Sequence, residues 1–418
     1  MRIRTAGVVA AAALALVAAG CSKSSGTTAG ASSSAKAGGG TVVIWADDQR
    51  AAALKPFAEK FGKDNGVTVQ VQAISKDLQT NFVTASQSGK GPDIVVGAHD
   101  WIGNLVQNGT IDPVQLSDAQ KSGFADVALR AVSFNGQLYG VPYAIENIAL
   151  IRNTDLAPTA PATLDDLVTQ GAALKKAGKV TNILSLQVGQ TGDAYHLEPL
   201  FTAGGGYLFG QKSNGQWDPT DLGVGKPASI AAAQKIFSLG EKGSGALTRS
   251  ITSDNAIPTF TGGKTAFLIS GPWAIADIKK AGVKYDITPI PTFAAGGRPA
   301  APFVGVQAFY LASKGKNKAL ASEFVTNYLT GTDLQVALYQ ANPRPPALTA
   351  ALTKVESADP DVQKWLDASK NGTPLPNIPQ MAAIWDPLGK AEAAIIGGAD
   401  PATTLATAAK AITDAINK

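Results

Sequence analysis

The chain has 418 residues, of which 45% are hydrophobic and 16% are charged, and its formal net charge is +4. This length exceeds one ordinary hydrophobic core, so we expect two lobes. The lysines are scattered among acidic residues and no basic block is interleaved with aromatics, which argues against a nucleic-acid partner. One cysteine and two histidines exclude an internal disulfide and disfavour a zinc site, so we expect no metal and no other cofactor.

The first 20 residues are typical of a secretory signal. Arg2 and Arg4 precede an apolar stretch at residues 8–19 that is too short to span a membrane, and Cys21 follows directly. The position of Cys21 is similar to that of the lipidated cysteine in a bacterial lipobox, although Ala18 stands where leucine is commonest. We therefore expect Cys21 to be lipidated. The alternative is ordinary signal cleavage, with the cysteine incidental.

Residues 21–40 predict a flexible tether behind that cysteine. They are built mainly of Gly, Ser, Thr and Ala and show no apolar period. Such a segment has a typical span of about 25 Å. We expect the folded body to stay at the extracellular face of the cell membrane, with the lipid as its membrane contact.

The folded part opens with a β-α-β-α-β pattern. Residues 42–45 form a short apolar run, residues 54–61 repeat apolar side chains at helical spacing, and Asn65-Gly66 is a typical helix end. Residues 67–71 then alternate as a strand does, and a buried run at 94–96 follows a Gly-Pro turn. This order predicts an α/β fold with a parallel sheet, in which ligands gather at the carboxyl ends of the strands.

Further along, a second set of helices and strands extends from residue 150 to about residue 301, and strand character resumes at Phe303. The prolines of residues 342–346 stiffen a segment that must hold its direction. Residues 391–418 are alanine-rich and predict a helical C-terminal tail that packs on one lobe.

Two tryptophans stand out because turn-forming residues fix each of them at the edge of an apolar run. Trp273 lies in Ile-Ser-Gly-Pro-Trp-Ala-Ile, and Trp385 ends Pro-Asn-Ile-Pro-Gln-Met-Ala-Ala-Ile-Trp. Rigid aromatic planes near loops suit the flat faces of sugar rings. The alternative is that both are buried packing anchors. Trp45 reads as a core residue, Trp217 lies in a turn and Trp365 on a helix, so we assign none of these three to a site.

These two strings and three other regions resemble the matching segments of maltose/maltodextrin-binding proteins, the extracellular solute-binding subunits (family 1) of ABC sugar importers. The other regions are residues 91–100, 142–156 and 302–306. Each match is weak alone, but their order and spacing from residue 41 to residue 418 are specific. The resemblance implies a type II periplasmic-binding-protein-like α/β fold with discontinuous lobes joined by a hinge. Lobe 1 is then 41–145 and 304–350, and lobe 2 is 146–303 and 351–418.

The same resemblance implies a sugar site with carboxylates, one basic group and aromatic planes. Asp100 and Glu146 match ligand carboxylates on loops, and Asp193 with Tyr195 matches an acid-x-Tyr sugar contact. The alternatives are capping or surface acids and a core tyrosine. After the first strand this chain is one residue shorter than the family, so the register of residues 47–50 is open. The complete expected set is Asp48, Arg50, Asp100, Trp101, Glu146, Asp193, Tyr195, Trp273 and Trp385.

Three departures from the family concern the substrate. Gly97 stands where the best-known maltodextrin binders have tryptophan, Trp101 stands where they have arginine, and Asp386 follows Trp385 where they have tyrosine. An aromatic is thus moved by four positions rather than lost. We expect a sugar-stacking pocket with a different preference for chain length or linkage.

The expected function is that of a monomeric, lipid-tethered receptor which binds maltose, maltodextrin or a related α-glucoside and delivers it to the transmembrane permease of an ABC importer. Another oligosaccharide or trehalose is an alternative ligand. The rival class is a secreted glycoside hydrolase, which requires two carboxylates on opposite sides of a glycosidic bond. A serine triad has little support, because the chain has no Gly-x-Ser-x-Gly elbow.

Overall fold

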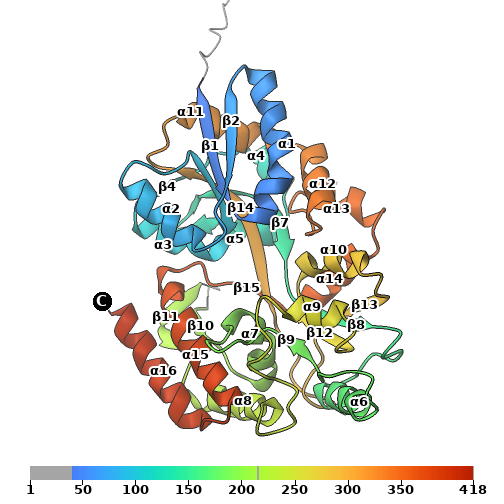
Figure 1. Cartoon of the computed structure of the whole chain (residues 1–418). Coiled ribbons are helices and arrows are strands. Elements are labelled where there is room, and N and C mark those ends of the chain that lie inside the picture. The colour runs from blue at the N-terminus through green and yellow to red at the C-terminus, as the bar shows by residue number, and fades with distance from the viewer. Residues whose placement is uncertain (1–39, 214–215, 418) are drawn as a thin grey trace, which may run out of the picture. The chain divides into compact units, whose positions relative to one another are not determined.

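The computed structural model describes residues 40–213 and 216–417 (Figure 1). The expected signal peptide, Cys21 and the tether lie outside these residues. Among the helices of the described residues, none combines the length and the apolar character that crossing a membrane requires.

The first sheet contains the predicted parallel core. Strand β1 pairs in parallel with β2 and with β3, which confirms the β-α-β-α-β prediction, and β14 runs antiparallel to β3 and β7. The order is β15-β14-β3-β1-β2, with β4 and β7 also on β14. The strands are β1 (Thr41–Ala46), β2 (Thr68–Ala73), β3 (Ile94–Ala98), β4 (Ile111–Asp112), β7 (Gly140–Glu146), β14 (Phe303–Ala312) and β15 (Thr373–Pro374), and a small hairpin joins β5 (Ser133–Phe134) to β6 (Gln137–Leu138).

Helix α1 (Asp48–Asn65) follows β1 and ends where the sequence predicts. The side chain of Asp47 caps its start, and Gly66 closes it in the left-handed conformation, with φ of 65°, that glycine adopts at little cost. The other helices of this part are α2 (Leu78–Gln87), α3 (Ile102–Gln107), α4 (Asp118–Lys121), α5 (Asp126–Ala131), α11 (Lys318–Glu323), α12 (Thr332–Ala341) and α13 (Thr349–Glu356), with a π-helical turn at Phe324–Tyr328.

A second sheet has the order β13-β8-β12-β9, formed by β8 (Ala149–Asn153), β9 (Ser185–Leu186), β12 (Phe267–Ser270) and β13 (Tyr285–Thr288). Helices α7, α8, α15 and α16 pack on one another beside it (Figure 1). The helices of this part are α6 (Leu164–Lys176), α7 (Ala194–Gly204), α8 (Pro227–Leu239), α9 (Ala256–Thr261), α10 (Ile275–Lys280), α14 (Asp361–Ser369), α15 (Trp385–Ile396) and α16 (Pro401–Ile416). The helical tail is therefore confirmed, as two helices rather than one.

Two large hydrophobic cores divide the described chain into discontinuous segments. The first core takes side chains from residues 42–145 and 304–351, and we call this part lobe 1. The second takes side chains from residues 148–303 and 375–412, which we call lobe 2, and a smaller cluster around β8 and β12 adds Trp365. Phe303 belongs to the second core and Val304 to the first. The chain thus passes between cores after β7, at the start of β14 and again between Ala351 and Trp365.

The three tryptophans outside the expected site lie in different surroundings. Trp365 is buried on α14, as its helical position suggested. Trp217 begins β11 (Trp217–Leu222), which pairs with β10 (Phe209–Gln211), so its assignment to a turn is wrong. Trp45 is half-buried rather than a core residue, because its strand turns alternate residues toward solvent and its indole N–H donates to Gln72.

Candidate functional site

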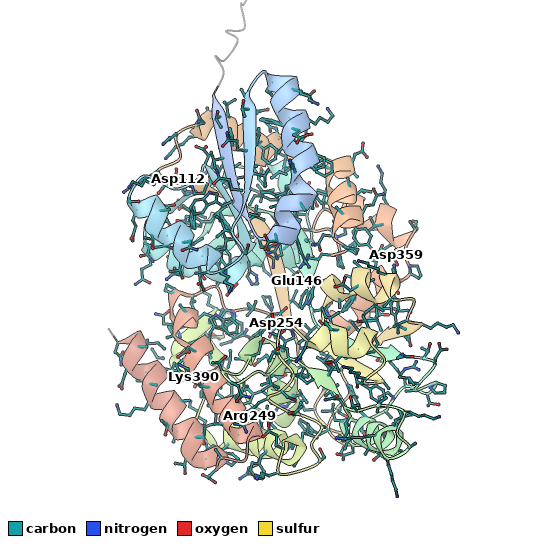
Figure 2. All side chains as sticks on the ribbon, in the orientation of Figure 1. Asp112, Glu146, Arg249, Asp254, Asp359 and Lys390 are labelled. Atoms are coloured by element: carbon teal, nitrogen blue, oxygen red, sulfur yellow. The ribbon has the colours of Figure 1, made fainter. Side chains whose placement is uncertain are left out.

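Residues from β7, from β14 and from the proline-rich segment at 342–346 meet at one buried carboxylate. Glu146 ends β7, lies opposite Gly305 on β14 and is 7% exposed (Figure 2). The side-chain amide of Gln307 on β14 donates to Glu146 Oε1 at 2.5 Å. Arg344, also 7% exposed, forms an ion pair with Oε2 through its Nε. Both carboxylate oxygens therefore have partners inside the protein.

The expectation that Glu146 lies on a loop is wrong, because it ends strand β7, and its expected contact with a sugar stays a prediction. Burial would raise the pKa of Glu146, but the positive charges of Arg344 and Arg50 and the hydrogen bond from Gln307 hold that pKa below its ordinary value. The group is an ionised structural carboxylate at neutral pH.

Arg50 lies on the first turn of α1 and points at the same region. Its Nε donates to the hydroxyl of Tyr143 at 2.9 Å, and its guanidinium also pairs with Asp47. Asp47 in addition caps the helix by accepting from the Arg50 backbone N–H. Asp48 is exposed and accepts from Ser75 at 3.1 Å instead. The sequence left open which residue of 47–50 is the acid beside Arg50. The structure shows that it is Asp47, whereas Asp48 lies at the surface.

Asp100 lies in a short 3-10 turn, His99–Trp101, directly after β3. The fully buried ring of His99 fixes this turn. Its Nδ1 accepts from the Val306 backbone at 3.0 Å, so its Nε2 carries the proton and donates to the Leu375 carbonyl at 3.0 Å. Burial lowers the pKa of His99 to about 4, which keeps the ring neutral.

Asp100 is half-buried and lines a pocket. Within residues 40–213 and 216–417, no other side chain donates a hydrogen bond to its carboxylate. Burial raises its pKa to about 7, with a smaller contribution from the negative charge of Glu146. Asp100 and Trp385 line the same pocket, whose volume is about 430 Å³. A carboxylate that can accept hydrogen bonds and a flat indole ring therefore line one pocket.

The indole of Trp101 lies against Gly97. A Cβ added at Gly97 would overlap the six-membered ring of Trp101, so glycine is required for this packing. Two of the departures from the family pattern, Gly97 and Trp101, are thus coupled, because the indole of Trp101 occupies the space that a side chain at position 97 would need.

Four aromatic rings form a continuous row in lobe 2. Trp273 and Tyr195 have ring centroids 6.4 Å apart, Tyr195 and Phe303 are stacked at 6.2 Å, and Phe303 meets Trp385 edge-on at 6.3 Å. The guanidinium of Arg344 lies 5.7 Å from the Trp273 ring. Both tryptophans are half-buried, so they are not the fully buried anchors of the alternative interpretation.

Asp193 caps α7, the helix that carries Tyr195, and its carboxylate is engaged by protein groups. It accepts from the His196 backbone at 3.0 Å, lies 3.0 Å from His196 Nδ1 and accepts from Gln187. Burial would raise its pKa, but His196 and these hydrogen bonds lower it. The hydroxyl of Tyr195 is buried and has no hydrogen-bond partner in the described part of the chain.

Several residues of this region were missed by the sequence analysis: Asp47, Tyr143, Phe303, Gln307 and Arg344. Phe303 stands in a segment that carried the family resemblance, and Arg344 stands in the proline-stiffened segment. Neither signal indicates a side-chain contact, because the partners lie far away along the chain.

A two-lobe α/β fold with polar groups of one lobe and aromatic rings of the other around its crossing segments defines a class of solute-binding proteins. Comparison with known families agrees: the model of the bacterial extracellular solute-binding protein family matches residues 56–368. The chain belongs to this family.

Three relatives are similar over most of their length. A maltooligosaccharide ABC transporter solute-binding lipoprotein of Streptococcus pneumoniae is 32% identical over 82% of this chain and 81% of the relative. The maltodextrin-binding protein MdxE of Bacillus subtilis is 31% identical over 78% of each chain. A galactooligosaccharide-binding protein of Bacillus subtilis is 28% identical over 88% of this chain and 87% of the relative.

The packing of Trp101 on Gly97 predicts a strong coupling between the two positions. We expect Gly97→Ala to lower the free energy of unfolding by about 1–3 kcal/mol, because the added methyl displaces the indole. In a protein that already carries Trp101→Ala, Gly97→Ala should lower the free energy of unfolding much less. Urea unfolding of the four proteins of this double-mutant cycle measures the coupling, and equal costs in both backgrounds would contradict the packing.

The buried ion pair predicts a pH-dependent loss in Glu146→Gln, which leaves the Arg344 charge without its partner. At neutral pH we expect the free energy of unfolding to fall by about 3–5 kcal/mol. The pKa of Glu146 is lowered in the fold, so its stabilisation is present above the ordinary value of 4.5 and is lost as the pH falls through the folded pKa. The difference from the parent protein should therefore shrink below pH 4.5.

Urea unfolding across this pH range is the measurement. Glu59→Gln, which removes an exposed carboxylate from α1, is the matched control and should change little at any pH. A constant difference between Glu146→Gln and the parent at all pH values would contradict the ion-pair account.

Proposed function

We propose that this protein is the receptor of an ABC importer and that it binds a neutral oligosaccharide of the maltodextrin type between lobe 1 and lobe 2. The row of rings from Trp273 to Trp385 is the observation that carries the proposal. Sugar rings have apolar faces that stack on such planes. The Streptococcus pneumoniae relative, a maltooligosaccharide transporter lipoprotein, and the maltodextrin-binding protein MdxE support the same ligand class.

Polar groups on both lobes complement the hydroxyls of such a ligand. Asp100 and Arg50 come from lobe 1, and Tyr195 comes from lobe 2 with a hydroxyl that lacks a protein partner. We propose these three groups as hydrogen-bonding residues, with Trp101, Trp273 and Trp385 as stacking surfaces. We propose that Asp48 contacts the sugar from the protein surface. Glu146 positions Gln307 and Arg344, and Asp193 positions the start of α7.

A galacto-oligosaccharide is the second candidate ligand. The Bacillus subtilis galactooligosaccharide-binding protein matches this chain over 88% of its length. Stacking on tryptophan does not by itself separate glucose from galactose units, because both present an apolar face. Trp101, whose indole packs on Gly97 and which follows Asp100 directly, is the residue that we expect to influence this choice.

We propose a binding role without catalysis. A glycoside hydrolase needs one carboxylate as acid and another as base or nucleophile. Glu146 is buried and has both oxygens engaged by Gln307 and Arg344, which disfavours it as the second carboxylate beside Asp100. The relatives named above are solute-binding proteins, which agrees with this role.

For cellular location, we propose a monomer tethered by a lipid on Cys21 to the outer face of the cell membrane. The Arg2–Ala19 pattern ahead of that cysteine supports secretion and lipidation. The Streptococcus pneumoniae relative is named a lipoprotein of an ABC transporter, which supports a permease as the partner.

The test is a tryptophan fluorescence titration of the mature protein with maltose, maltotriose and galacto-oligosaccharides. We expect one series to change the emission, because Trp273 and Trp385 pass from water into contact with sugar. Replacing either indole with alanine should weaken binding by about 1–3 kcal/mol. Trp45→Phe, outside the site, is the control and should bind as the parent does. A parent protein that responds to no oligosaccharide would refute the proposal.

The rival hydrolase predicts a different result for Asp100→Asn. At a pH well above the Asp100 pKa of about 7, where the carboxylate is ionised, a receptor should bind sugar about 10- to 100-fold more weakly in this variant, because a hydrogen bond to a charged group is lost. No variant should release reducing sugar. Reducing-sugar release by the parent protein that disappears in Asp100→Asn would favour the enzyme.

A further inference from the structure

A second pocket, with a volume of about 490 Å³, shares only Phe303 with the row of rings. Its lining comes mainly from α7, from the β10–β11 hairpin and from residues 298–303 and 371–376. None of the groups proposed to contact sugar lines it, so it is separate from the pocket at Asp100 and Trp385. Its volume falls in the range of small-molecule sites.

A buried carboxyl without a partner lines this second pocket. Glu198 belongs to α7 and is only 4% exposed, and its Oε2 has no hydrogen-bond partner in the described ranges. Glu392 lies on α15, which packs on α7, and both of its carboxyl oxygens are also unpaired there. Buried polar groups are nearly always paired in folded proteins. An unpaired carboxyl in the wall of a pocket therefore indicates a ligand group that pairs with it.

The surroundings of Glu198 favour its neutral form in the protein alone. Burial raises the pKa of Glu198 well above its usual range, and the nearby carboxyl of Glu392 raises that pKa further. A cation beside Glu198 would reverse the preference, because an opposite charge stabilises the carboxylate. Arg298 also lines the pocket, but it is exposed, so water and salt screen its charge.

The rest of the wall is rich in aromatic rings. Tyr207, Phe209, Trp217 and Phe303 all line the pocket. Aromatic faces attract cations, and they pack well against apolar groups. Among the described residues, no group of three His, Cys, Asp or Glu side chains is placed to hold a metal ion. The wall therefore suits an organic cation with an apolar body.

We propose that this pocket binds a small organic amine, whose ammonium group pairs with Glu198 and whose apolar body packs against Trp217 and Phe303. On binding, the Glu198 carboxyl gives its proton to water and the ammonium group keeps its own protons. A charged pair forms, and the proton leaves to the solvent. This site is additional to the sugar site and does not depend on it.

The experiment is calorimetry of the mature protein with tyramine and with 4-ethylphenol, which has the same ring and no amine. Tyramine should bind about 10- to 100-fold more tightly, the effect of a hydrogen bond between charged groups. At pH 7, its binding should release about one proton, measured as a dependence of the binding heat on the ionisation enthalpy of the buffer. Saturating maltotriose should leave tyramine binding unchanged, because the two sites are separate.

Three variants locate the site, and far-UV circular dichroism checks that each is folded. Glu198→Gln should weaken tyramine binding by about 10- to 100-fold, remove the proton release and leave 4-ethylphenol binding unchanged. Trp217→Ala should weaken tyramine binding by about 2- to 30-fold through loss of the ring. Glu392→Gln is the matched control. Burial raises the pKa of Glu392 as well, so a neutral amide replaces a neutral acid outside the pocket lining, and tyramine should bind as in the parent.

The comparison of tyramine with 4-ethylphenol tests the proposal in the parent protein without any variant. Equal affinity for the two compounds, no binding of tyramine, or binding without proton release would overturn it. Tyramine binding that survives Glu198→Gln, or that falls equally in Glu392→Gln, would also overturn it, as would displacement of tyramine by maltotriose. All of these outcomes leave the proposed sugar receptor intact.

Discussion

The ion pair between Glu146 and Arg344 is the contact on which the arrangement of the site depends. It joins the end of β7 to the proline-rich segment at 342–346, and Gln307 adds β14 to the same carboxylate. Removing two charges from water is costly, and their attraction offsets that cost only where further hydrogen bonds satisfy both groups. Gln307 supplies one such bond to Glu146, and Asn342 supplies another to Arg344.

This network also links the crossing segments to the ligand-facing groups. Arg344 lies over the indole of Trp273, and the adjacent backbone of Ile145 donates to Pro345 at 2.8 Å. His99 adds a second link, because its two ring nitrogens bond to Val306 on β14 and to Leu375. The groups proposed to contact sugar are thus carried on elements that the buried polar contacts hold in register. A ligand that contacts both lobes shifts the conformational equilibrium toward the state in which both lobes contact it, because it binds that state more tightly.

Much of the local structure was predictable because it depends on near neighbours. The cap and end of α1, the parallel strands β1 to β3 and the position of the C-terminal helices follow from periodicity and turn residues. Contacts between distant segments were not predictable in this way. Arg344 is 198 residues from Glu146, and no spacing rule indicates that the two side chains meet.

The candidate site shows the same limit. Motif resemblance pointed to Trp273, Trp385, Tyr195 and Asp100, and the structure brings the first three into one aromatic row with Phe303. It could not distinguish Asp47 from Asp48, because one residue of register decides which acid caps α1 and faces Arg50. The displaced aromatic at Trp101 was visible as a change of letters, but its packing on Gly97 required the backbone.

The central claim is that one ligand is held by both lobes, and hydrogen–deuterium exchange with and without saturating maltotriose tests it most directly. The account predicts that sugar slows amide exchange both in residues 99–104 of lobe 1 and in residues 193–197 and 272–275 of lobe 2. Protection confined to a single lobe under saturating ligand would contradict it.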